Sequence, residues 1–340
     1  MTTRSATPTG VASSSTPDPE MQAVLDALAS LGGKPLETLT AAEARTQPTP
    51  ADAVKTLLQQ QGKSSSPEPV GGVEDRRIAG PGGEIPIRIY RPMGDGRFPL
   101  ILYIHGGGWV IADLDTYDAS ARALTNAAQA VVVSTHYRQA PEHRYPAAHD
   151  DAFAAYQWTL KNAVSLTGHA ARVAVAGESA GGNMAAVVSI RARDRKIPCP
   201  VHQLLVYPVA GTDMNTESYR QNADAKPLNK AMMQWFATHY LGEAAPGNAE
   251  IDLVTRPDLP GLPPTTIITA DIDPLRSEGK MLAKVLTAAG VPVAWRNFAG
   301  STHEFFGMTA VLPDAKEAVA FAAREMKTSF AAVRRGGLSG

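Results

Sequence analysis

Residues 172–182, RVAVAGESAGG, place Ser179 between two different sequence patterns. The run 172–176 is typical of a buried strand, and the small and apolar residues from Ala180 onward are typical of a helix. A sharp strand-to-helix turn holds its middle residue in an unfavourable backbone conformation, and bulky residues two positions away would collide. Gly177 and Gly181 occupy those two positions. The stretch therefore favours a serine hydroxyl that projects above a sheet over one that only caps the helix.

Strand and helix patterns alternate on both sides of this turn. A predicted hairpin comes first, with strands at 73–79 and 84–92 joined by GPGG. The alternation after it predicts an α/β fold, with a mostly parallel, doubly wound eight-stranded sheet flanked by helices and an antiparallel start. The other strands are expected at 98–105, 128–136, 172–177, 202–208, 265–270 and 291–299, and helices around 147–163, from 180, around 277–290 and near 314–327.

Three segments depart from this alternation. Residues 1–18 are rich in Ser, Thr, Pro and Gly, which predicts a flexible tail. Residues 19–72 are expected to form an accessory piece, with short helices at 21–31 and 51–61 and a linker at 62–72. The main domain, 73–340, contains an insertion at 209–262 with one good helical pattern, at 229–242. Insertions of this size at the carboxyl end of a strand usually serve as lids or binding walls.

Composition limits the kinds of partner. The chain has 340 residues, of which 44% are hydrophobic, and a net charge of -1 without blocks of like charge. It can bury a large core, but it lacks the basic surface expected of a nucleic-acid binder. A single cysteine excludes an internal disulfide framework and suits a reducing compartment. With no apolar signal segment and no long apolar run, we expect a cytoplasmic protein without membrane insertion that acts on small molecules.

A serine hydroxyl becomes a good nucleophile only when a base removes its proton. In this kind of fold the order along the chain is serine, then an acid, then histidine, and only His303 follows the later strands. It stands in GSTHEF, directly after the last predicted strand. Asp271 and Asp273 both follow the strand at 265–270, and either can orient the imidazole. His303 is therefore the predicted base, and the acid is one of two aspartates.

The motif HGGGW, residues 105–109, follows the predicted strand at 98–105. Three successive glycines allow the backbone to approach a reacting centre with its N–H groups turned inward. The N–H groups of Gly106, Gly107 and Ala180 are therefore candidates for an oxyanion hole. His105 itself we interpret as structural.

Five motifs occur in a fixed order: HGGGW, YRQAPEHRYPAA, GESAGGNMA, DPLRSEG and GSTHEF, which begin at residues 105, 137, 177, 273 and 300. Together they resemble the hormone-sensitive-lipase-like (bacterial family IV) carboxylesterases of the α/β-hydrolase superfamily, from about Val73 to the last predicted helix. The resemblance implies the α/β-hydrolase fold. By the same resemblance, the nucleophile falls on Ser179, the acid on Asp273, the base on His303 and the oxyanion-hole glycines on Gly106 and Gly107.

The resemblance also implies a helical cap, built from the N-terminal helices and the insertion, that shapes the substrate pockets. Trp109 is a candidate substrate contact, whereas Trp235 and Phe236 are expected mainly to pack against a neighbouring helix. The sequence departs from the family pattern at three positions. Glu178, His136 and Ser277 each stand where the family often has aspartate. None is a residue of the predicted triad, so these departures bear on subfamily and substrate.

Other functions fit less well. The stretch HEFFG lacks the second histidine of a zinc helix, and GGGWVI lacks the last glycine of a dinucleotide fingerprint. An amidase or lactonase would use the same triad, and a ligand receptor on this fold, such as the plant gibberellin receptors, would lack the catalytic histidine. We therefore expect a carboxylesterase that hydrolyses small esters with short-to-medium acyl chains, without cofactor or metal. A homodimer formed through an edge strand is compatible with such a sheet.

Overall fold

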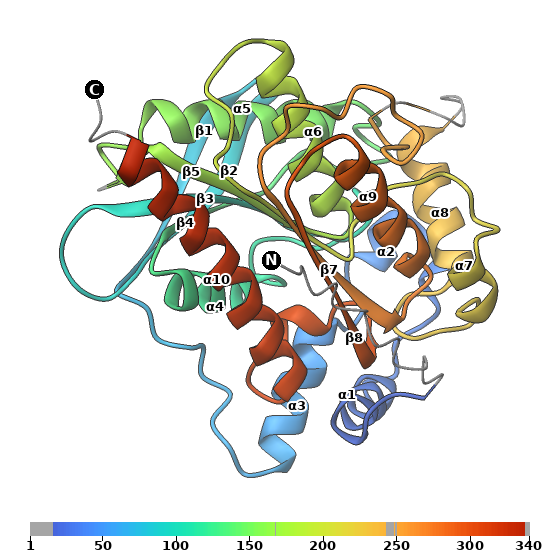
Figure 1. Ribbon diagram of the computed structural model, residues 1–340. Coiled ribbons are helices and arrows are strands. Elements are labelled where there is room, and N and C mark those ends of the chain that lie inside the picture. The colour runs from blue at the N-terminus through green and yellow to red at the C-terminus, as the bar shows by residue number, and fades with distance from the viewer. Residues whose placement is uncertain (1–15, 167, 243–247, 249, 337–340) are drawn as a thin grey trace, which may run out of the picture.

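The computed structural model describes residues 16–166, 168–242, 248 and 250–336, and its centre is one eight-stranded sheet (Figure 1). The strands lie in the order β1-β2-β4-β3-β5-β6-β7-β8, so the predicted eight-stranded, mostly parallel sheet is confirmed. Their bounds are β1 Gly72–Gly80, β2 Gly83–Arg91, β3 Phe98–Ile104, β4 Val131–Thr135, β5 Gly168–Glu178, β6 Gln203–Val206, β7 Thr265–Ile272 and β8 Val293–Thr302.

The antiparallel start is also confirmed. β1 pairs with β2 in a hairpin that closes at Gly80 and Gly83, and β2 pairs antiparallel with β4. From β4 to β8 every neighbouring pair is parallel. Every residue of β4, β6 and β7 is buried, as expected of strands covered on both faces. The carboxyl ends of the parallel strands therefore meet at one edge, which is where ligands bind in such sheets.

Two helical layers cover the sheet. Alternate residues of β3 face opposite cores: Leu102 belongs to one hydrophobic cluster and Tyr103 to the other. The cluster of Leu102 contains the buried faces of α5, α6 and α9, and the cluster of Tyr103 contains those of α1, α4 and α10. Figure 1 shows α4 and α10 together on one side of the sheet. The helices are α1 Pro19–Ser30, α2 Ala41–Ala44, α3 Pro50–Gln60, α4 Asp118–Ala128, α5 Ala147–Lys161, α6 Ala180–Asp194, α7 Glu217–Gln221, α8 Lys230–Leu241, α9 Arg276–Ala288 and α10 Pro313–Gly336, with single 3-10 turns η1 Leu36–Thr38 and η2 Phe305–Gly307.

The accessory segment 19–72 lies against the insertion 209–262. The indole Nε1 of Trp235 in α8 donates to the carbonyl of Leu39 at 3.1 Å. The amide of Asn229, which caps α8, donates to Glu37 Oε1 in η1 at 3.4 Å. The helices expected at 21–31 and 51–61 are α1 and α3, shifted by one or two residues. Most of the predicted flexible tail, residues 1–15, lies outside the described residues.

Three helices were not predicted from the sequence: α2, which spans four residues, α4 and α7. α4 begins after Tyr117, which makes no side-chain capping bond, and ends at Gln129 in the left-handed conformation. The usual start and stop signals, a capping side chain and a glycine, are thus both missing. α7 is only five residues long. Among the described residues, no helix is both long and apolar enough to cross a bilayer.

Candidate active site

Ser179 occupies the turn between β5 and α6 with φ 57° and ψ -119°, a backbone conformation that costs on the order of 1–3 kcal/mol. Both flanking glycines are required by close packing. A Cβ on Gly177 would lie 2.1 Å from the Gly181 carbonyl oxygen, and one on Gly181 would lie 2.0 Å from the carbonyl oxygen of Ile104. A side chain at either position would therefore force β5, α6 or the end of β3 to move.

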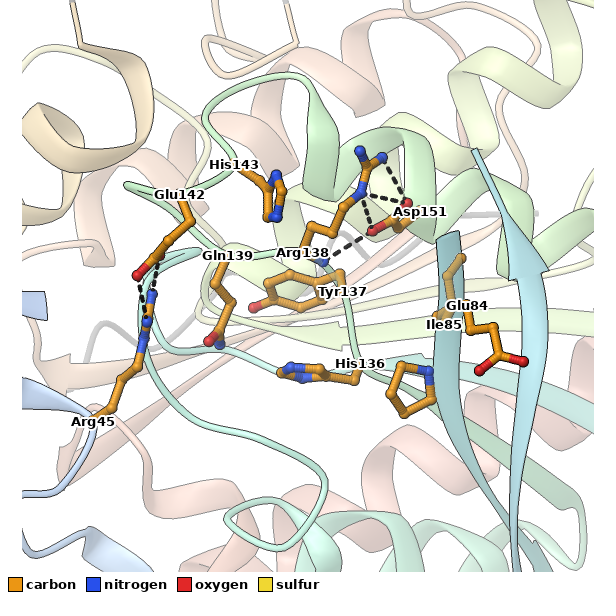
Figure 2. Close-up of a pocket in the computed structure, with 11 residues that line it drawn as sticks. Arg45, Glu84, Ile85, His136, Tyr137, Arg138, Gln139, Glu142, His143 and Asp151 are labelled. Carbon is orange, nitrogen blue, oxygen red and sulfur yellow. Dashed lines mark hydrogen bonds and ion pairs between the residues drawn. The ribbon is translucent and has the colours of Figure 1, made fainter. Parts of the chain in front are cut away.

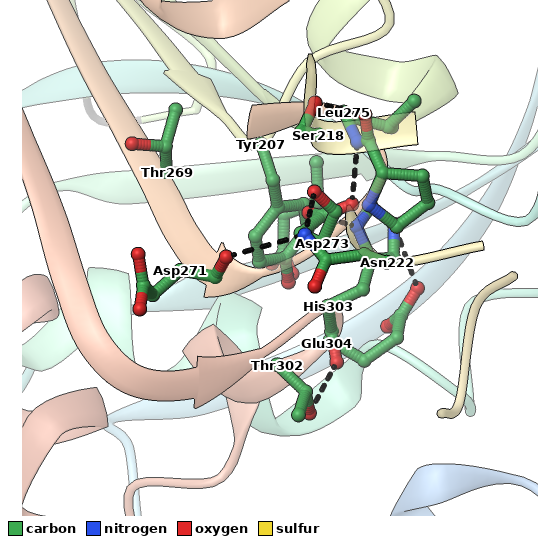
Figure 3. Close-up of polar contacts among 12 residues, drawn as sticks. Tyr207, Ser218, Asn222, Thr269, Asp271, Asp273, Leu275, Thr302, His303 and Glu304 are labelled. Carbon is green, nitrogen blue, oxygen red and sulfur yellow. Dashed lines mark hydrogen bonds and ion pairs between the residues drawn. The ribbon is translucent and has the colours of Figure 1, made fainter. Parts of the chain in front are cut away.

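His303 lies at the end of β8, and its Nδ1 is 2.7 Å from Oδ2 of Asp273, just beyond β7 (Figure 3). Both side chains are buried. The other Asp273 oxygen, Oδ1, accepts the backbone N–H of Leu275 at 2.8 Å. Because the carboxylate is fixed by two partners, it holds the Nδ1–H of the imidazole and leaves Nε2 as the proton acceptor.

Asp271 takes a different position from Asp273. Its carboxylate forms an ion pair with Arg276 at 2.9 Å and accepts the amide of Asn297 at 3.3 Å. Asn222, between α7 and α8, donates to the backbone carbonyl of Asp273 at 3.1 Å (Figure 3). No sequence pattern predicts this contact of Asn222, because it depends on how the insertion folds over the end of β7.

The charge around His303 favours the imidazolium. Burial lowers the pKa of His303, but the carboxylate of Asp273 and its hydrogen bond outweigh that effect, and Glu304 and Glu178 act in the same direction. The net result is a pKa above the ordinary value. His303 is therefore a stronger base than an isolated histidine, and it must lose its proton before it can act.

The glycine loop packs directly against the Ser179 turn. A Cβ on Gly106 would lie 2.3 Å from the Tyr117 hydroxyl and 3.1 Å from the Glu178 carbonyl oxygen. Gly107 has φ 92°, which other residues rarely adopt, and its carbonyl accepts N–H groups of the following turn. In these hydrogen bonds the loop contributes its Gly107 carbonyl as the acceptor. The N–H groups of Gly106 and Gly107 have no hydrogen-bond acceptor within the described parts of the chain.

A hydrogen-bond network fixes this loop from behind. His105 Nδ1 and the Tyr137 hydroxyl both contact the Gly106 carbonyl, each at 2.8 Å. His105 Nε2 lies 3.0 Å from Nδ1 of His136. Burial lowers the pKa of His105 to about 3, and the neighbouring His136 adds to this. A neutral His105 that donates from Nδ1 to Gly106 can accept from His136, which agrees with the structural interpretation of His105.

A pocket of about 960 Å³ opens above this arrangement. Ser179, Gly107 and His303 lie on its floor side, and residues of the accessory segment and the insertion form its other walls. Phe236 of α8 reaches the glycine loop, since a Cβ on Gly108 would meet its ring at 2.3 Å. Its larger apolar wall residues are Leu25, Leu28, Leu36, Ile111, Val209, Leu228, Met232, Met233, Phe236 and Ile272.

A second pocket, of about 380 Å³, lies between the start of β2 and the segment that follows β4 (Figure 2). Two ion pairs stand in its wall, Arg138 with Asp151 at 2.8 Å and Arg45 with Glu142 at 2.6 Å. His136 borders both pockets. Most of the lining residues are thus polar, and the charged groups of the two ion pairs already have partners.

Trp109 lies away from the wall of the large pocket. Its ring is 3% exposed and stacks on Tyr240 with the ring centroids 4.5 Å apart. The pocket is lined by Gly107, Gly108 and Ile111 on either side of it in sequence, but not by Trp109. The tight turn of the glycine loop turns this side chain into the core, so we do not retain it as a substrate contact.

The described residues contain no cluster of three or more His, Cys, Asp or Glu side chains arranged to hold a metal ion.

Comparison with known proteins places the chain in a family. A family model described as alpha/beta hydrolase fold matches residues 101–307. Carboxylesterase NlhH of Mycobacterium tuberculosis is 43% identical over 260 residues, which cover 72% of this chain and 79% of that protein. The chain belongs to the hormone-sensitive-lipase-like carboxylesterases of the α/β-hydrolase superfamily. The family resemblance predicted from the sequence is thereby confirmed.

The fold of this esterase is similar to solved structures over nearly the whole length of the chain. An alpha/beta hydrolase enzyme from the metagenome of Lake Arreo is 37% identical with a TM-score of 0.83, covering 94% of this chain and all (100%) of that chain. A hyperthermophilic esterase from the archaeon Pyrobaculum calidifontis is 35% identical with a TM-score of 0.82, covering 94% of this chain and 99% of that one. The accessory segment of the esterase therefore has a counterpart in its relatives.

The three departures of this esterase from the family pattern all have partners. His136 contacts His105, and the Ser277 hydroxyl accepts the backbone N–H of Ser218 at 3.1 Å. Glu178 belongs to a larger cluster, described next.

Glu178 lies beneath the active site and is 1% exposed. Its two carboxylate oxygens accept the hydroxyls of Tyr103 and Tyr207. The Tyr207 ring lies 4.4 Å from the imidazole of His303 between centroids. Burial raises the pKa of Glu178 to about 7, and the charge of Glu304 adds to this. Glutamate at 178 thus connects three strand ends below the proposed base.

Proposed function

We propose that this esterase uses Ser179 as nucleophile, His303 as base and Asp273 as the acid that orients the base. The main support is the 2.7 Å contact between His303 Nδ1 and Asp273 Oδ2 at the same pocket that Ser179 borders. The strained turn at Ser179 is the second support. The three residues directly follow β5, β7 and β8, in the chain order of this fold.

In the first half of the reaction Ser179 Oγ attacks the ester carbonyl and gives its proton to His303 Nε2. Asp273 stabilises the imidazolium that forms. The negative charge on the carbonyl oxygen is stabilised by the N–H groups of Gly106, Gly107 and Ala180, and loss of one such donor typically costs about 10² to 10³ in rate. His303 then protonates the departing alcohol, which leaves an acyl group on Ser179.

In the second half, water attacks the acyl group with His303 as base, and the acid is released. Each of the predicted site residues therefore has one chemical role. The donors for the oxyanion come from a loop that Tyr137 and His105 hold by its Gly106 carbonyl, so they need no rearrangement during the reaction.

For substrate we propose small carboxylic esters with short-to-medium acyl chains. The pocket of about 960 Å³ with apolar walls suits a ligand of small to moderate size. Two relatives carry matching names: an arylesterase of Saccharolobus solfataricus is 34% identical over 72% of this chain, and an ethyl acetate hydrolase of Pseudomonas putida is 31% identical over 83%. An amidase or lactonase activity would use the same groups on another carbonyl.

We further propose that residues 19–72 and 209–262 form one cap over residues 73–208 and 263–340. The support is that Trp235 and Asn229 of the insertion bond to Leu39 and Glu37 of the accessory segment, and that both segments line the same pocket. A cap built from two distant segments can exclude water from the reaction.

The decisive experiment compares wild type with Ser179→Ala and His303→Ala on a series of p-nitrophenyl esters of increasing acyl length. Each variant should lose most of the hydrolysis while circular dichroism and thermal unfolding remain close to wild type. Near wild-type turnover in either variant would contradict the mechanism. A fluorophosphonate probe should label wild type at Ser179 and leave Ser179→Ala unlabelled. An unlabelled wild type would favour a ligand receptor on this fold.

A further inference from the structure

Glu304, the residue after the proposed base, places a second carboxylate beside the His303 imidazole. Its Oε1 is 3.9 Å from Nε2 of His303, whereas Asp273 contacts Nδ1 on the other side of the ring (Figure 3). Nε2 is the atom that exchanges protons with the nucleophile and the departing group. Glu304 therefore lies on the side of the ring where the reaction takes place.

The position of this carboxylate is fixed by the fold. Glu304 has φ 72°, a left-handed conformation that is uncommon outside glycine and frequent at functional sites. The Tyr117 hydroxyl donates to Oε1 at 2.6 Å. Tyr117 in turn packs against Gly106, leaving no room for a Cβ there. The carboxylate is thus tied to the glycine loop.

Glu304 also faces the substrate. It lines the large pocket together with Ser179 and His303, and its side chain is 20% exposed. Burial raises the pKa of Glu304, which the hydrogen bond from Tyr117 and the charge of His303 oppose. An ionised carboxylate has no proton to donate, so Glu304 in that form acts only as a hydrogen-bond acceptor next to Nε2.

The 3.9 Å separation allows one water molecule to contact both groups. An oxygen about 2.8 Å from each atom would place the two hydrogen bonds at about 90°, which is near the angle between the O–H bonds of water. One O–H would then point to Nε2 and the other to Glu304 Oε1. An alcohol has a single O–H group, and with that group on Nε2 its alkyl part would face the carboxylate.

We propose that Glu304 acts in deacylation by positioning the attacking water, and that it thereby favours hydrolysis over acyl transfer to alcohols. This inference rests on the proposed acyl-enzyme function. The water oxygen bonds to the acyl carbon, one of its protons passes to His303 Nε2, and its remaining O–H donates to Glu304. The bond from the acyl carbon to Ser179 Oγ then breaks, Oγ takes the proton from Nε2, and the carboxylic acid leaves.

The test measures how the acyl-enzyme divides between two acceptors. Wild type, Glu304→Leu, Glu304→Gln and Tyr117→Phe are each incubated with p-nitrophenyl butyrate and increasing methanol. Methyl butyrate and butyric acid are then quantified by gas chromatography. Both products arise from the same intermediate, so their ratio does not depend on how much of a variant is folded.

We expect the ratio of methyl ester to acid to rise about tenfold or more in Glu304→Leu, because the leucine cannot accept the second hydrogen bond of water. Glu304→Gln, whose amide oxygen still accepts, should lie between leucine and wild type. Tyr117→Phe should show a smaller rise, because the carboxylate remains but loses its anchor. A ratio in Glu304→Leu and Glu304→Gln equal to that of wild type would overturn the proposal.

The two proposals fail in different ways. Turnover by Ser179→Ala would contradict the acyl-enzyme itself. If instead Ser179 is acylated in wild type and in Glu304→Leu, and the product ratio is the same in both, only the role of Glu304 is contradicted.

Discussion

His303 Nδ1 and Asp273 Oδ2 lie 2.7 Å apart, and this hydrogen bond links the residues that directly follow β8 and β7. The same aspartate accepts the N–H of Leu275, and Asn222 of the insertion holds its backbone carbonyl. The carboxylate proposed as the acid therefore has a partner on each oxygen, and it contacts the imidazole through Nδ1.

Replacing Asp273 by asparagine should lower kcat by about 10⁴, because the amide can hold the imidazole in the wrong tautomer. The matched control is Asp271→Asn, two residues earlier, whose carboxylate pairs with Arg276 instead. Steady-state kinetics on p-nitrophenyl acetate at one pH check both variants. Comparable losses in the two would show that Asp273 has no special role.

Tyr207→Phe and Tyr103→Phe each remove one hydrogen bond to Glu178, but only Tyr207 packs against His303. We expect Tyr207→Phe to lower kcat/KM and to shift its acid limb, since the ring is freed to move against the base. Tyr103→Phe should change thermal stability with a smaller effect on the pH profile. The pH dependence of kcat/KM in both variants distinguishes these roles, and identical profiles would contradict the prediction.

Glu178 should make folding less favourable as pH rises from about 4.5 to about 7. Its pKa is raised by burial from 4.5 to about 7, so the folded protein retains a proton that the unfolded chain loses. The stabilisation is complete below about pH 4.5 and is lost as pH approaches 7, at about 1.4 kcal/mol per pKa unit. The free energy of unfolding of wild type and Glu178→Gln can be measured with denaturant from pH 5 to 8. We expect the variant to gain stability relative to wild type as the pH rises. A difference independent of pH would contradict it.

Three buried histidines should make the protein sensitive to acid. Burial lowers the pKa of His105 to about 3, and those of His149 and His202 to about 4. The unfolded chain binds these protons near pH 6.5, so stability is present above that pH and is lost as pH falls toward 4. His202→Gln, which can still bond to Ser329 and Thr266, should reduce the slope of unfolding free energy between pH 6.5 and 4.5. If this slope were the same in His202→Gln as in wild type, His202 would not contribute to the acid sensitivity.

Phe236→Ala should extend the accepted acyl length, because its ring lies over the glycine loop in the wall of the pocket. Trp235→Phe is the control, since the neighbouring indole bonds to Leu39 instead of lining the pocket. The measurement is kcat/KM across p-nitrophenyl esters from acetate to decanoate. We expect the maximum to move to longer chains only in Phe236→Ala. If Phe236→Ala had the same acyl-length preference as wild type, Phe236 would not limit the acyl chain.

Much of the fold could be predicted because its signals are local. The strand at 98–105 is a continuous apolar run, and GPGG at 80–83 closes a hairpin. Helix α4 was missed because it lacks a capping side chain and a terminal glycine, and is held by packing against α10 and the sheet. Signals that depend on packing are invisible in a single sequence.

In the candidate site, too, some features follow from local sequence and others depend on packing. The residue types and their order are local features of the sequence: a serine between two glycines, three successive glycines after a core strand, and one late histidine, His303. The glycines in these motifs are needed because the tight turns leave no room for side chains, and this requirement involves only residues close together in the chain. The folded chain alone shows that Asp273, and not Asp271, contacts His303, that Trp109 faces the core, and that Glu178 and Glu304 lie near His303. These outcomes depend on side-chain directions at the ends of separate strands, and those directions are set by packing between residues far apart in the chain.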